Sequence, residues 1–260
     1  MSELKQIKSA LISVFSKDGL DELVLALSQH DVQIISTGGT QKYIESLGIT
    51  VTPVEDITSY PSILGGRVKT LHPKVFGGIL SRRENQEDGK QLNEFEIPEI
   101  DLVVVDLYPF EKTVSSGASH NDIIEKIDIG GVSLIRAAAK NYEDITVISH
   151  KSDYKTLVDI ISKNGPKTSL DDRKKFAFLG FKLTTKYDSS INQYLSPETE
   201  KKALRYGENP HQKGWFQGNL NDVFNQLHGK AISYNNLLDI DAAVMLMADF
   251  DDSSATFGIL

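Results

Sequence analysis

A short segment that combines positive charge with glycine is the strongest sign of chemistry in this sequence of 260 residues. Arg67, Lys69, His72 and Lys74 lie close together, Thr70 stands among them, and a pair of glycines flanks the segment on each side. The chain as a whole has a formal net charge of −8. Because an acidic protein must gather its cations to hold an anion, the segment favours an anionic substrate over a solvated basic loop.

Ser36, Thr37, Gly38, Gly39 and Thr40 form a second candidate site, between a predicted strand and a predicted helix. Two glycines let backbone N–H groups turn inward, and a helix N-terminus surrounded by hydroxyl groups is well suited to phosphate. A tight turn with capping hydroxyls explains the pattern equally well. The segment is neither a P-loop nor a GxGxxG fingerprint, so it does not indicate a nucleoside triphosphate or a dinucleotide.

Two further loops supply a cation, an aromatic ring and a carboxylate. Ser13 and Lys17 follow the first predicted strand, although taken alone residues 16–18 favour helix capping and a solvated charge. Tyr108 follows the most apolar predicted strand, where its ring is placed to stack on a flat heterocycle.

Asp128 precedes Gly130 and Gly131 at the start of a predicted helix, and Lys140 lies later on that helix. An N-cap aspartate and a solvated basic face are the alternative interpretation. Together the four loops predict a site for a phosphorylated heterocycle that undergoes proton transfers without a metal or a cofactor.

Composition argues against several other functions. The chain has no cysteine, which excludes disulfides and thiolate catalysis, and its 6 histidines lack the spacing of metal ligands. The acidic balance argues against nucleic-acid binding, and no apolar run is long enough to span a membrane. We expect a cytoplasmic enzyme with a small-molecule substrate, no nucleic-acid partner and no membrane contact.

Strand and helix patterns alternate through the first part of the chain. Strands are predicted at 9–14, 32–35, 50–54, 102–107 and 145–148, and helices at 19–29, 41–47, 123–126 and 132–141. The strand at 102–107 is apolar on both faces, which is typical of the centre of a parallel sheet. The alternation predicts a doubly wound parallel α/β domain, in which ligands bind at the carboxyl ends of the strands.

The pattern changes after residue 152. Helices are predicted at 154–163 and 170–194, with no strand between them. We expect a first domain at 1–195, a polar linker at 196–203 and a second domain at 204–260. Because the last part is short for a core of its own and ends in a strand-like run at 255–260, we expect it to be incomplete.

Six motifs carry a resemblance to a known family. In chain order they are STGGT, GGRVKTLHPK, DLYPF, IEKIDIGGVSLIRAAAKN, RYGENPHQ and ISYNNLLDIDAA. They resemble the bifunctional aminoimidazolecarboxamide ribonucleotide (AICAR) transformylase/IMP cyclohydrolase, over essentially the whole chain. The resemblance implies a methylglyoxal-synthase-like domain that closes formyl-AICAR to IMP with loss of water. It also implies the start of a cytidine-deaminase-like transformylase domain, and a place in the last two steps of purine biosynthesis.

The resemblance also implies roles for the loop residues. Ser13, Lys17 and the loop 36–40 would hold the 5′-phosphate, Arg67 would lie near the base, and the backbone at 130–131 would add hydrogen-bond donors. The residues that would act in proton transfer or contact the reacting ring are Lys69, Thr70, Tyr108, Asp128 and Lys140. The cyclohydrolase would need no cofactor and no metal.

In the second domain, Arg205, Tyr206 and Asn236 match AICAR-binding positions, and His211 lies in the same motif region. The family's catalytic Lys-His pair would come shortly after Leu260, so formyl transfer is not expected from this chain. The full-length protein would use 10-formyltetrahydrofolate as cosubstrate and would be a homodimer.

The sequence departs from the family pattern at some positions, and two alternative functions stay open. Phe15, Ser16 and Asp18 interrupt the phosphate-binding pattern of many relatives, and Asp106 replaces an asparagine that can donate a hydrogen bond. A methylglyoxal-synthase-type lyase is one alternative, against which the GGRVKTLHP and RYGENPHQ motifs argue. A non-catalytic regulatory domain that binds a phosphorylated nucleotide is the other.

Overall fold

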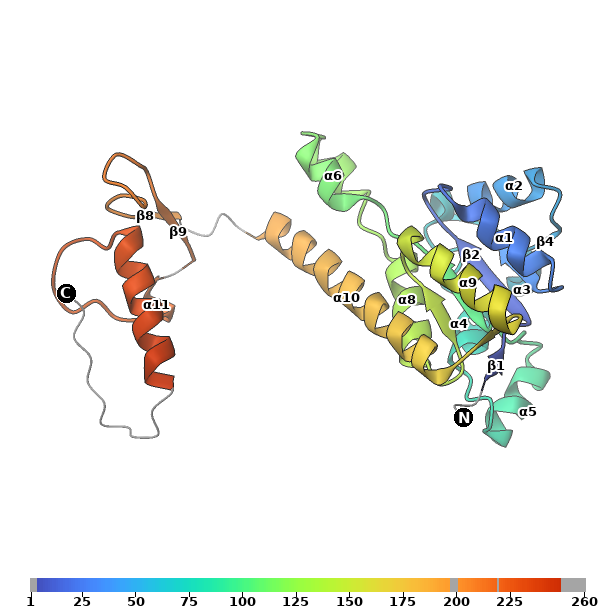
Figure 1. Cartoon of the computed structure of the whole chain (residues 1–260). Coiled ribbons are helices and arrows are strands. Elements are labelled where there is room, and N and C mark those ends of the chain that lie inside the picture. The colour runs from blue at the N-terminus through green and yellow to red at the C-terminus, as the bar shows by residue number, and fades with distance from the viewer. Residues whose placement is uncertain (1–3, 197–200, 219, 249–260) are drawn as a thin grey trace. The chain divides into compact units, whose positions relative to one another are not determined.

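The computed structural model describes residues 4–196, 201–218 and 220–248. The chain divides into two compact units, residues 1–193 and 194–260 (Figure 1). Each unit is described by itself below.

A five-stranded sheet forms the centre of the first unit. Its strands in spatial order are β4 (Val51–Pro53), β3 (Gln33–Ser36), β2 (Ser9–Ser13), β5 (Leu102–Val105) and β6 (Thr146–Ile148). Every neighbouring pair is parallel, so all the carboxyl ends lie at one edge. The predicted parallel α/β fold is confirmed.

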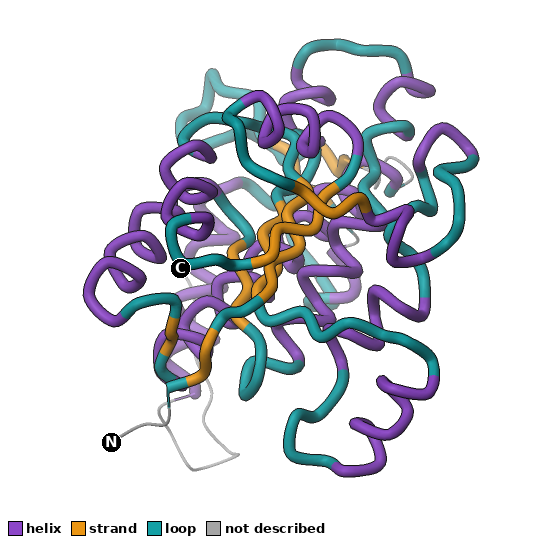
Figure 2. Tube along the Cα trace, turned by 90° about the vertical axis from the view of Figure 1, so that its right-hand side faces the viewer, coloured by secondary structure: helices purple, strands orange, loops and turns teal. Residues whose placement is uncertain are grey.

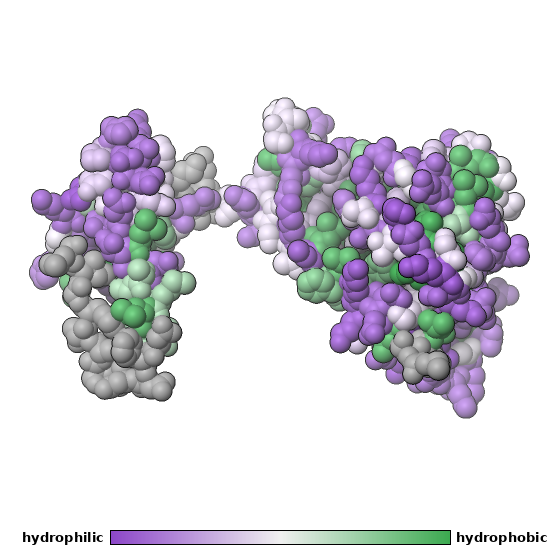
Figure 3. Space-filling view, viewed as in Figure 1, coloured by the Kyte–Doolittle hydropathy of each residue, from purple (hydrophilic) through white to green (hydrophobic). Residues whose placement is uncertain are grey.

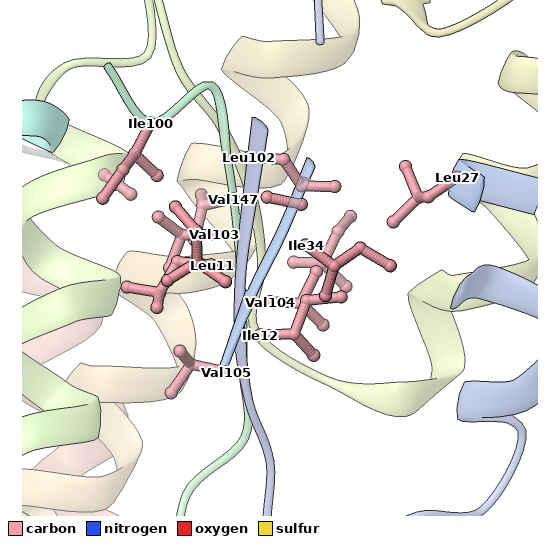
Figure 4. Packing of buried hydrophobic residues seen from close by; sticks show 14 of the residues in the cluster. Leu11, Ile12, Leu27, Ile34, Ile100, Leu102, Val103, Val104, Val105 and Val147 are labelled. Carbon is pink, nitrogen blue, oxygen red and sulfur yellow. The ribbon is translucent and has the colours of Figure 1, made fainter. Parts of the chain in front are cut away.

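Both faces of this sheet are buried. Ile12 and Val104 point to the side of Leu27 on α1 (Leu20–Ser28), whereas Leu11 and Val103 point to the opposite side (Figure 4). All of them are fully buried. Because neighbouring residues on a strand face opposite sides, a strand covered on both sides is apolar at every position. This explains the continuous apolar runs in the sequence.

Helices cover the two faces of the sheet, and Figure 2 shows them on both sides of the strands. On one face α1 packs with α9 (Tyr154–Asn164). On the other face α4 (Pro73–Leu80) packs with α8 (Gly130–Lys140), and α10 (Leu170–Leu195) lies over α8. A side chain at Gly180 of α10 would lie 3.2 Å from Ile135 of α8, so glycine is what lets these helices approach closely.

Shorter elements connect these layers. They are α2 (Gly38–Ser46), α3 (Val54–Thr58), the 3-10 helices η1 (Leu64–Gly66) and η2 (Lys151–Asp153), α5 (Gln86–Glu94), α6 (Phe110–Ser115) and α7 (His120–Ile124). The segment 65–79, interpreted from sequence as one loop, becomes helical at Pro73. Proline suits the first helical position, and His72 caps the helix by accepting a hydrogen bond from Lys74 N.

The sequence predicted no strand between the helices at 154–163 and 170–194, and this prediction is wrong. A short strand, β7 (Lys167–Thr168), pairs antiparallel with β1 (Lys5–Gln6) beside the main sheet. Two residues are too few to show a periodic pattern, and the partner strand lies at the other end of the unit's sequence. Only the folded chain brings the two together.

The second unit contains a small antiparallel pair, β8 (Lys201–Ala203) and β9 (Trp215–Gln217), then η3 (Leu220–Asp222) and α11 (Tyr234–Ala248). Apolar side chains of α11, including Leu238, Val244 and Met245, are exposed, and Figure 3 shows apolar surface on this unit. The strand expected at 255–260 lies outside the described residues.

Gly78 shows how α4, which follows the cationic segment, is fixed to the sheet. A Cβ at this position would lie 2.2 Å from the carbonyl oxygen of Pro98. The carbonyl oxygen of Gly78 accepts hydrogen bonds from Ile100 N and from Arg83 Nη2, both at 3.1 Å. Since Ile100 leads into β5, this contact sets the position of α4 relative to the strand.

We predict that Gly78→Ala lowers the free energy of unfolding by about 1–3 kcal/mol, because the backbone must move away from Pro98. The matched control is Gly89→Ala on α5, where an added Cβ meets no atom within 4 Å. That control should gain about 0.5–1 kcal/mol from the lower flexibility of alanine. Urea unfolding followed by circular dichroism measures both, and equal midpoints for the two variants would contradict the close approach.

Candidate active site

A cavity of about 680 Å³ opens among the loops that follow β2, β3 and β5. The segment 65–70 and the N-terminus of α8 complete its walls. The predicted site residues that line it are Ser13, Lys17, Thr37, Gly39, Thr40, Arg67, Lys69, Thr70, Tyr108, Asp128, Gly130 and Gly131. Loops that are far apart in the sequence therefore converge at one site, as the parallel sheet predicts.

One end of the cavity combines a helix N-terminus with two ammonium groups. Gly38 opens α2 with a φ of +57°, and a Cβ there would lie 3.1 Å from Lys69 Nζ. Burial lowers the pKa of Lys17; the Asp106 carboxylate opposes this shift, and the charge of Lys69 adds to it. First-turn N–H groups have no partner within their own helix, so this end suits a phosphate.

The hydroxyl groups of the loop after β3 are largely engaged in holding that loop. Ser36 Oγ donates to the carbonyl of Ile12 at 2.6 Å and is buried behind the cavity wall. Thr40 Oγ1 donates to Val14 O at 2.9 Å and accepts from Val14 N at 3.1 Å. Thr37 Oγ1 donates to Glu55 Oε1 at 3.1 Å. The backbone N–H groups are thus the better candidates for phosphate contacts.

Another part of the cavity wall carries the Asp128 carboxylate. Its Oδ1 accepts a hydrogen bond from Gly131 N at 2.7 Å, at the start of α8. Burial raises the pKa of Asp128, although hydrogen bonds from the backbone of Gly131 and Tyr108 oppose the shift. The buried Thr70 hydroxyl lies 3.2 Å from where a Cβ of Gly130 would stand. A carboxyl with a raised pKa beside a hydroxyl is suited to proton transfer.

Tyr108 forms an aromatic wall of the cavity and is 41% exposed. Phe15 packs against it edge-on, with ring centroids 5.4 Å apart. Lys126 Nζ lies 5.4 Å from the centroid of the Tyr108 ring. These two contacts hold the ring in place while part of it remains open to a ligand.

Arg67 lies at an exposed part of the cavity wall. Its Nη2 donates to both carboxylate oxygens of Glu125, which follows α7. Both side chains are more than half exposed, so the ion pair adds little to stability. Its structural effect is to tie the cationic segment to the segment that carries Asp128.

Lys140 is not brought to this cavity. It is the last residue of α8 and is exposed, whereas Gly130 at the first residue lines the cavity. At 1.5 Å per residue the two ends of the helix are about 15 Å apart. The geometry of this chain therefore gives no support to the role predicted for Lys140, and the proposal below leaves it out.

The three residues predicted to bind AICAR gather within the second unit. Arg205 Nη2 donates to the Tyr206 hydroxyl at 2.9 Å, and a side-chain hydrogen bond with Ser233 is the main cause that lowers the pKa of Tyr206. Asn236 Oδ1 accepts from Ser233 N at 3.2 Å and from its hydroxyl at 2.9 Å. Ser233 therefore links Tyr206 to Asn236, and Arg205 joins them through the Tyr206 hydroxyl.

The described residues contain neither a cluster of metal ligands nor a membrane-spanning helix. In those residues no group of three or more His, Asp or Glu side chains is arranged to hold a metal ion. None of the helices in the same ranges is long and apolar enough to cross a membrane.

Two curated relatives match nearly the whole chain. The bifunctional purine biosynthesis protein PurH of Bacteroides thetaiotaomicron is 56% identical over 269 residues, which cover 100% of this chain and 53% of that protein. PurH of Rhodospirillum rubrum is 46% identical over 262 residues, which cover 94% of this chain and 50% of that protein. The chain spans about half the length of the curated relatives it matches.

Two family models match adjoining parts of the chain. The model of the MGS-like domain matches residues 19–133, and the model of the AICARFT/IMPCHase bienzyme matches residues 138–260. The chain belongs to the AICARFT/IMPCHase bienzyme family. The crystal structure of ForH, which is 30% identical with a TM-score of 0.62, is similar over 71% of this chain and 97% of the ForH chain. The family resemblance seen in the motifs is confirmed.

Asp106, predicted from the sequence to depart from the pattern of many relatives, has a clear structural consequence. Its Oδ1 accepts a hydrogen bond from Phe15 N, and its Oδ2 accepts one from Ser16 N at 2.9 Å. An asparagine has one acceptor oxygen and could not accept both bonds in this way. Asp106 therefore fixes the loop after β2 to the end of β5, close to Lys17.

The sequence did not indicate the role of several residues in and beside the cavity. Glu125 lines the cavity and pairs with Arg67, and Lys126 lies over the ring of Tyr108 in the cavity wall. Ile127, Ile129 and Leu134 supply apolar lining. Their types carry no signal of chemistry, and only the convergence of the loops reveals their place.

We predict opposite effects of two variants on the pKa of Lys17. Asp106→Asn removes the charge that opposes the shift, so the pKa of Lys17 should fall further below 10.5. Lys69→Met removes a charge that lowers it, so the pKa should rise. Titration of ¹³C-labelled lysine by NMR measures both. A Lys17 resonance that titrates identically in the two variants and the unchanged chain would refute this electrostatic arrangement.

Proposed function

We propose that the first unit is an IMP cyclohydrolase, which closes formyl-AICAR to IMP with loss of water. The observation that carries the proposal is the presence of Lys69, Thr70 and Asp128 at the same cavity as a helix N-terminus that suits a phosphate. Membership of a bifunctional purine biosynthesis family supports this reaction class.

The two ends of the cavity suit the two ends of the substrate. The 5′-phosphate binds at the N-terminus of α2, where Lys17 and the backbone N–H groups of the helix neutralise its charge. The imidazole ring then extends toward Tyr108, and the carboxamide and formyl groups reach Asp128 and Thr70. This orientation follows from charge, because the Lys17 ammonium and the helix N-terminus attract phosphate and the Asp128 carboxylate repels it.

Ring closure moves two protons from nitrogen atoms of the substrate to the formyl oxygen, which leaves as water. The carboxamide nitrogen attacks the formyl carbon, a C–N bond forms, and the nitrogen loses a proton to the Asp128 carboxylate. The formyl oxygen gains negative charge, and Lys69 with the Thr70 hydroxyl and the α8 backbone N–H groups stabilises it. The proton held by Asp128 then passes to this oxygen and makes it a hydroxyl. The former formamide nitrogen loses its N–H proton, and a proton added to the hydroxyl lets it leave as water, so that a C=N bond forms and the ring becomes aromatic.

Orientation accounts for much of the rate. The attacking nitrogen and the formyl carbon belong to the same molecule, so the enzyme needs to hold one rotamer in which they meet. Anchoring the phosphate at one end and the ring against Tyr108 at the other restricts the rotations between them. The side chains that line the cavity then need only to transfer protons.

A methylglyoxal-synthase-type lyase is the second candidate, because the MGS-like model covers residues 19–133. Both activities need a phosphate site, so the site at α2 does not distinguish them. Phosphate release from dihydroxyacetone phosphate would favour the lyase. Binding of formyl-AICAR without turnover would favour a regulatory domain.

For the longer protein we propose formylation of AICAR with 10-formyltetrahydrofolate as cosubstrate, by a homodimer. In that protein Arg205, Tyr206 and Asn236 would contact AICAR. Their association through Ser233 within the second unit supports a shared ligand.

We predict that Lys69→Ala lowers the cyclohydrolase rate by about 100-fold or more, because a positioned proton donor contributes at least this much. The rise in ultraviolet absorbance as formyl-AICAR becomes IMP measures the rate. Lys90→Ala is the matched control, since Lys90 is an exposed lysine on α5 that pairs with Glu87 at 3.3 Å. Undiminished turnover by Lys69→Ala would rule out its catalytic role.

We also predict that Gly131→Ala lowers kcat by about 100-fold, because a Cβ there would lie 2.7 Å from Asp128 Oδ2 and displace the carboxylate. Gly89→Ala, the control variant from α5, should retain the full rate. Unfolding curves for both variants show whether the fold persists. A fully active Gly131→Ala chain would mean that the position of Asp128 is not needed for turnover.

A further inference from the structure

The hydroxyl of Tyr187 makes two hydrogen bonds to the segment that carries Asp128. It accepts from Asp128 N at 2.8 Å and donates to the carbonyl oxygen of Lys126, also at 2.8 Å. The two bonds span Ile127, so one side-chain atom closes the backbone of this turn. Tyr187 belongs to α10, which carries none of the site residues predicted from sequence.

Tyr187 is itself held firmly. Its side chain is 8% exposed, and its ring packs edge-on against Phe110 with centroids 6.1 Å apart. Burial raises the pKa of Tyr187 to about 12, so the hydroxyl keeps the proton that it donates to Lys126 O. The close packing of α10 on α8 at Gly180 fixes the helix from which the side chain extends.

The segment held by Tyr187 supports one residue of the cavity wall, Tyr108, and supplies another, Asp128. Lys126 places its ammonium over the Tyr108 ring, and Asp128 places its carboxylate at Gly131 N. Local hydrogen bonds stabilise the turn that precedes Asp128. Lys126 N and Ile127 N each donate to a carbonyl oxygen three residues earlier, at 3.0 Å. The contact with Tyr187 is what joins this turn to a distant helix.

We propose that Tyr187 is a positioning residue for Asp128, fixing the backbone on both sides of Ile127 so that the carboxylate meets the reacting nitrogen. This inference rests on the cyclohydrolase function proposed above. Tyr187 does not line the cavity that holds the predicted site residues, so it acts through Asp128 and not on the substrate.

A second buried tyrosine provides a matched control. Tyr154 on α9 is 4% exposed, and in the described part of the chain its hydroxyl has no hydrogen-bond partner. Replacing either tyrosine with phenylalanine removes one buried hydroxyl and keeps the ring. Only Tyr187→Phe removes hydrogen bonds to the Asp128 segment, and it leaves Asp128 N and Lys126 O without this partner.

The first experiment compares the kinetics of the two variants with formyl-AICAR. Tyr187→Phe should lower kcat by about 10-fold or more and change KM by less than about 3-fold, because the carboxylate is displaced while the phosphate site is intact. Tyr154→Phe should keep both constants. Equal kcat values for the two variants, or a change confined to KM, would overturn the proposal.

A double-variant comparison tests whether Tyr187 acts through Asp128. In a chain that already carries Asp128→Asn, Tyr187→Phe should reduce kcat by less than about 2-fold further, since the group it positions no longer moves a proton. A full additional loss would show that Tyr187 acts independently of Asp128 and would overturn the proposal.

Hydrogen exchange separates this proposal from the cyclohydrolase itself. Tyr187→Phe should speed amide exchange at Asp128 by about 10-fold or more, whereas Tyr154→Phe should leave it unchanged. A chain that lacks turnover but shows this exchange pattern would refute the proposed reaction and keep the structural role of Tyr187. Unchanged exchange at Asp128 in Tyr187→Phe would refute the positioning role, whatever the turnover.

Discussion

The parallel direction of all five strands is the constraint on which the cavity depends. Because parallel strands share one carboxyl edge, the chain must leave the sheet there each time before it turns into a helix. The loop after β2, the loop after β3 and the loop after β5 are therefore forced together. Helix N-termini come with them, and each helix start brings backbone N–H groups that suit an anion.

The charges at this edge are arranged as two opposed groups. Lys17 and Lys69 lie with the N-terminus of α2, whereas Asp128 lies with the N-terminus of α8. Asp106 lies where it affects both groups, since its charge raises the pKa of Lys17 and of Asp128. It thus favours the protonated form of each while its oxygens hold the first loop. A single carboxylate links the geometry of the cavity to its proton chemistry.

The sequence predicted the parallel sheet and most of the loops at its edge, because buried strands leave continuous apolar runs that are read locally. It did not predict β7, whose pairing with β1 depends on residues far apart in the chain. The position of Lys140 could not be predicted for another reason. Motif membership gives no measure of distance along a helix, and α8 carries Lys140 away from the cavity. Tyr187 lies in a long predicted helix with no sequence signal of its own, and only its two hydrogen bonds reveal a role.

Glycine has a different part in this site from the one its sequence pattern indicates. The paired glycines predicted a backbone free to turn, and the positive φ of Gly38 agrees with that. At Gly131, however, φ is ordinary, and the decisive feature is the missing Cβ, which would lie 2.7 Å from a carboxylate oxygen of Asp128. The missing Cβ of Gly38 likewise leaves room for the Lys69 ammonium. These glycines therefore leave room for the charged groups beside the helix N-termini. A substitution would displace those charged groups, and so impair catalysis, before it disturbed the fold.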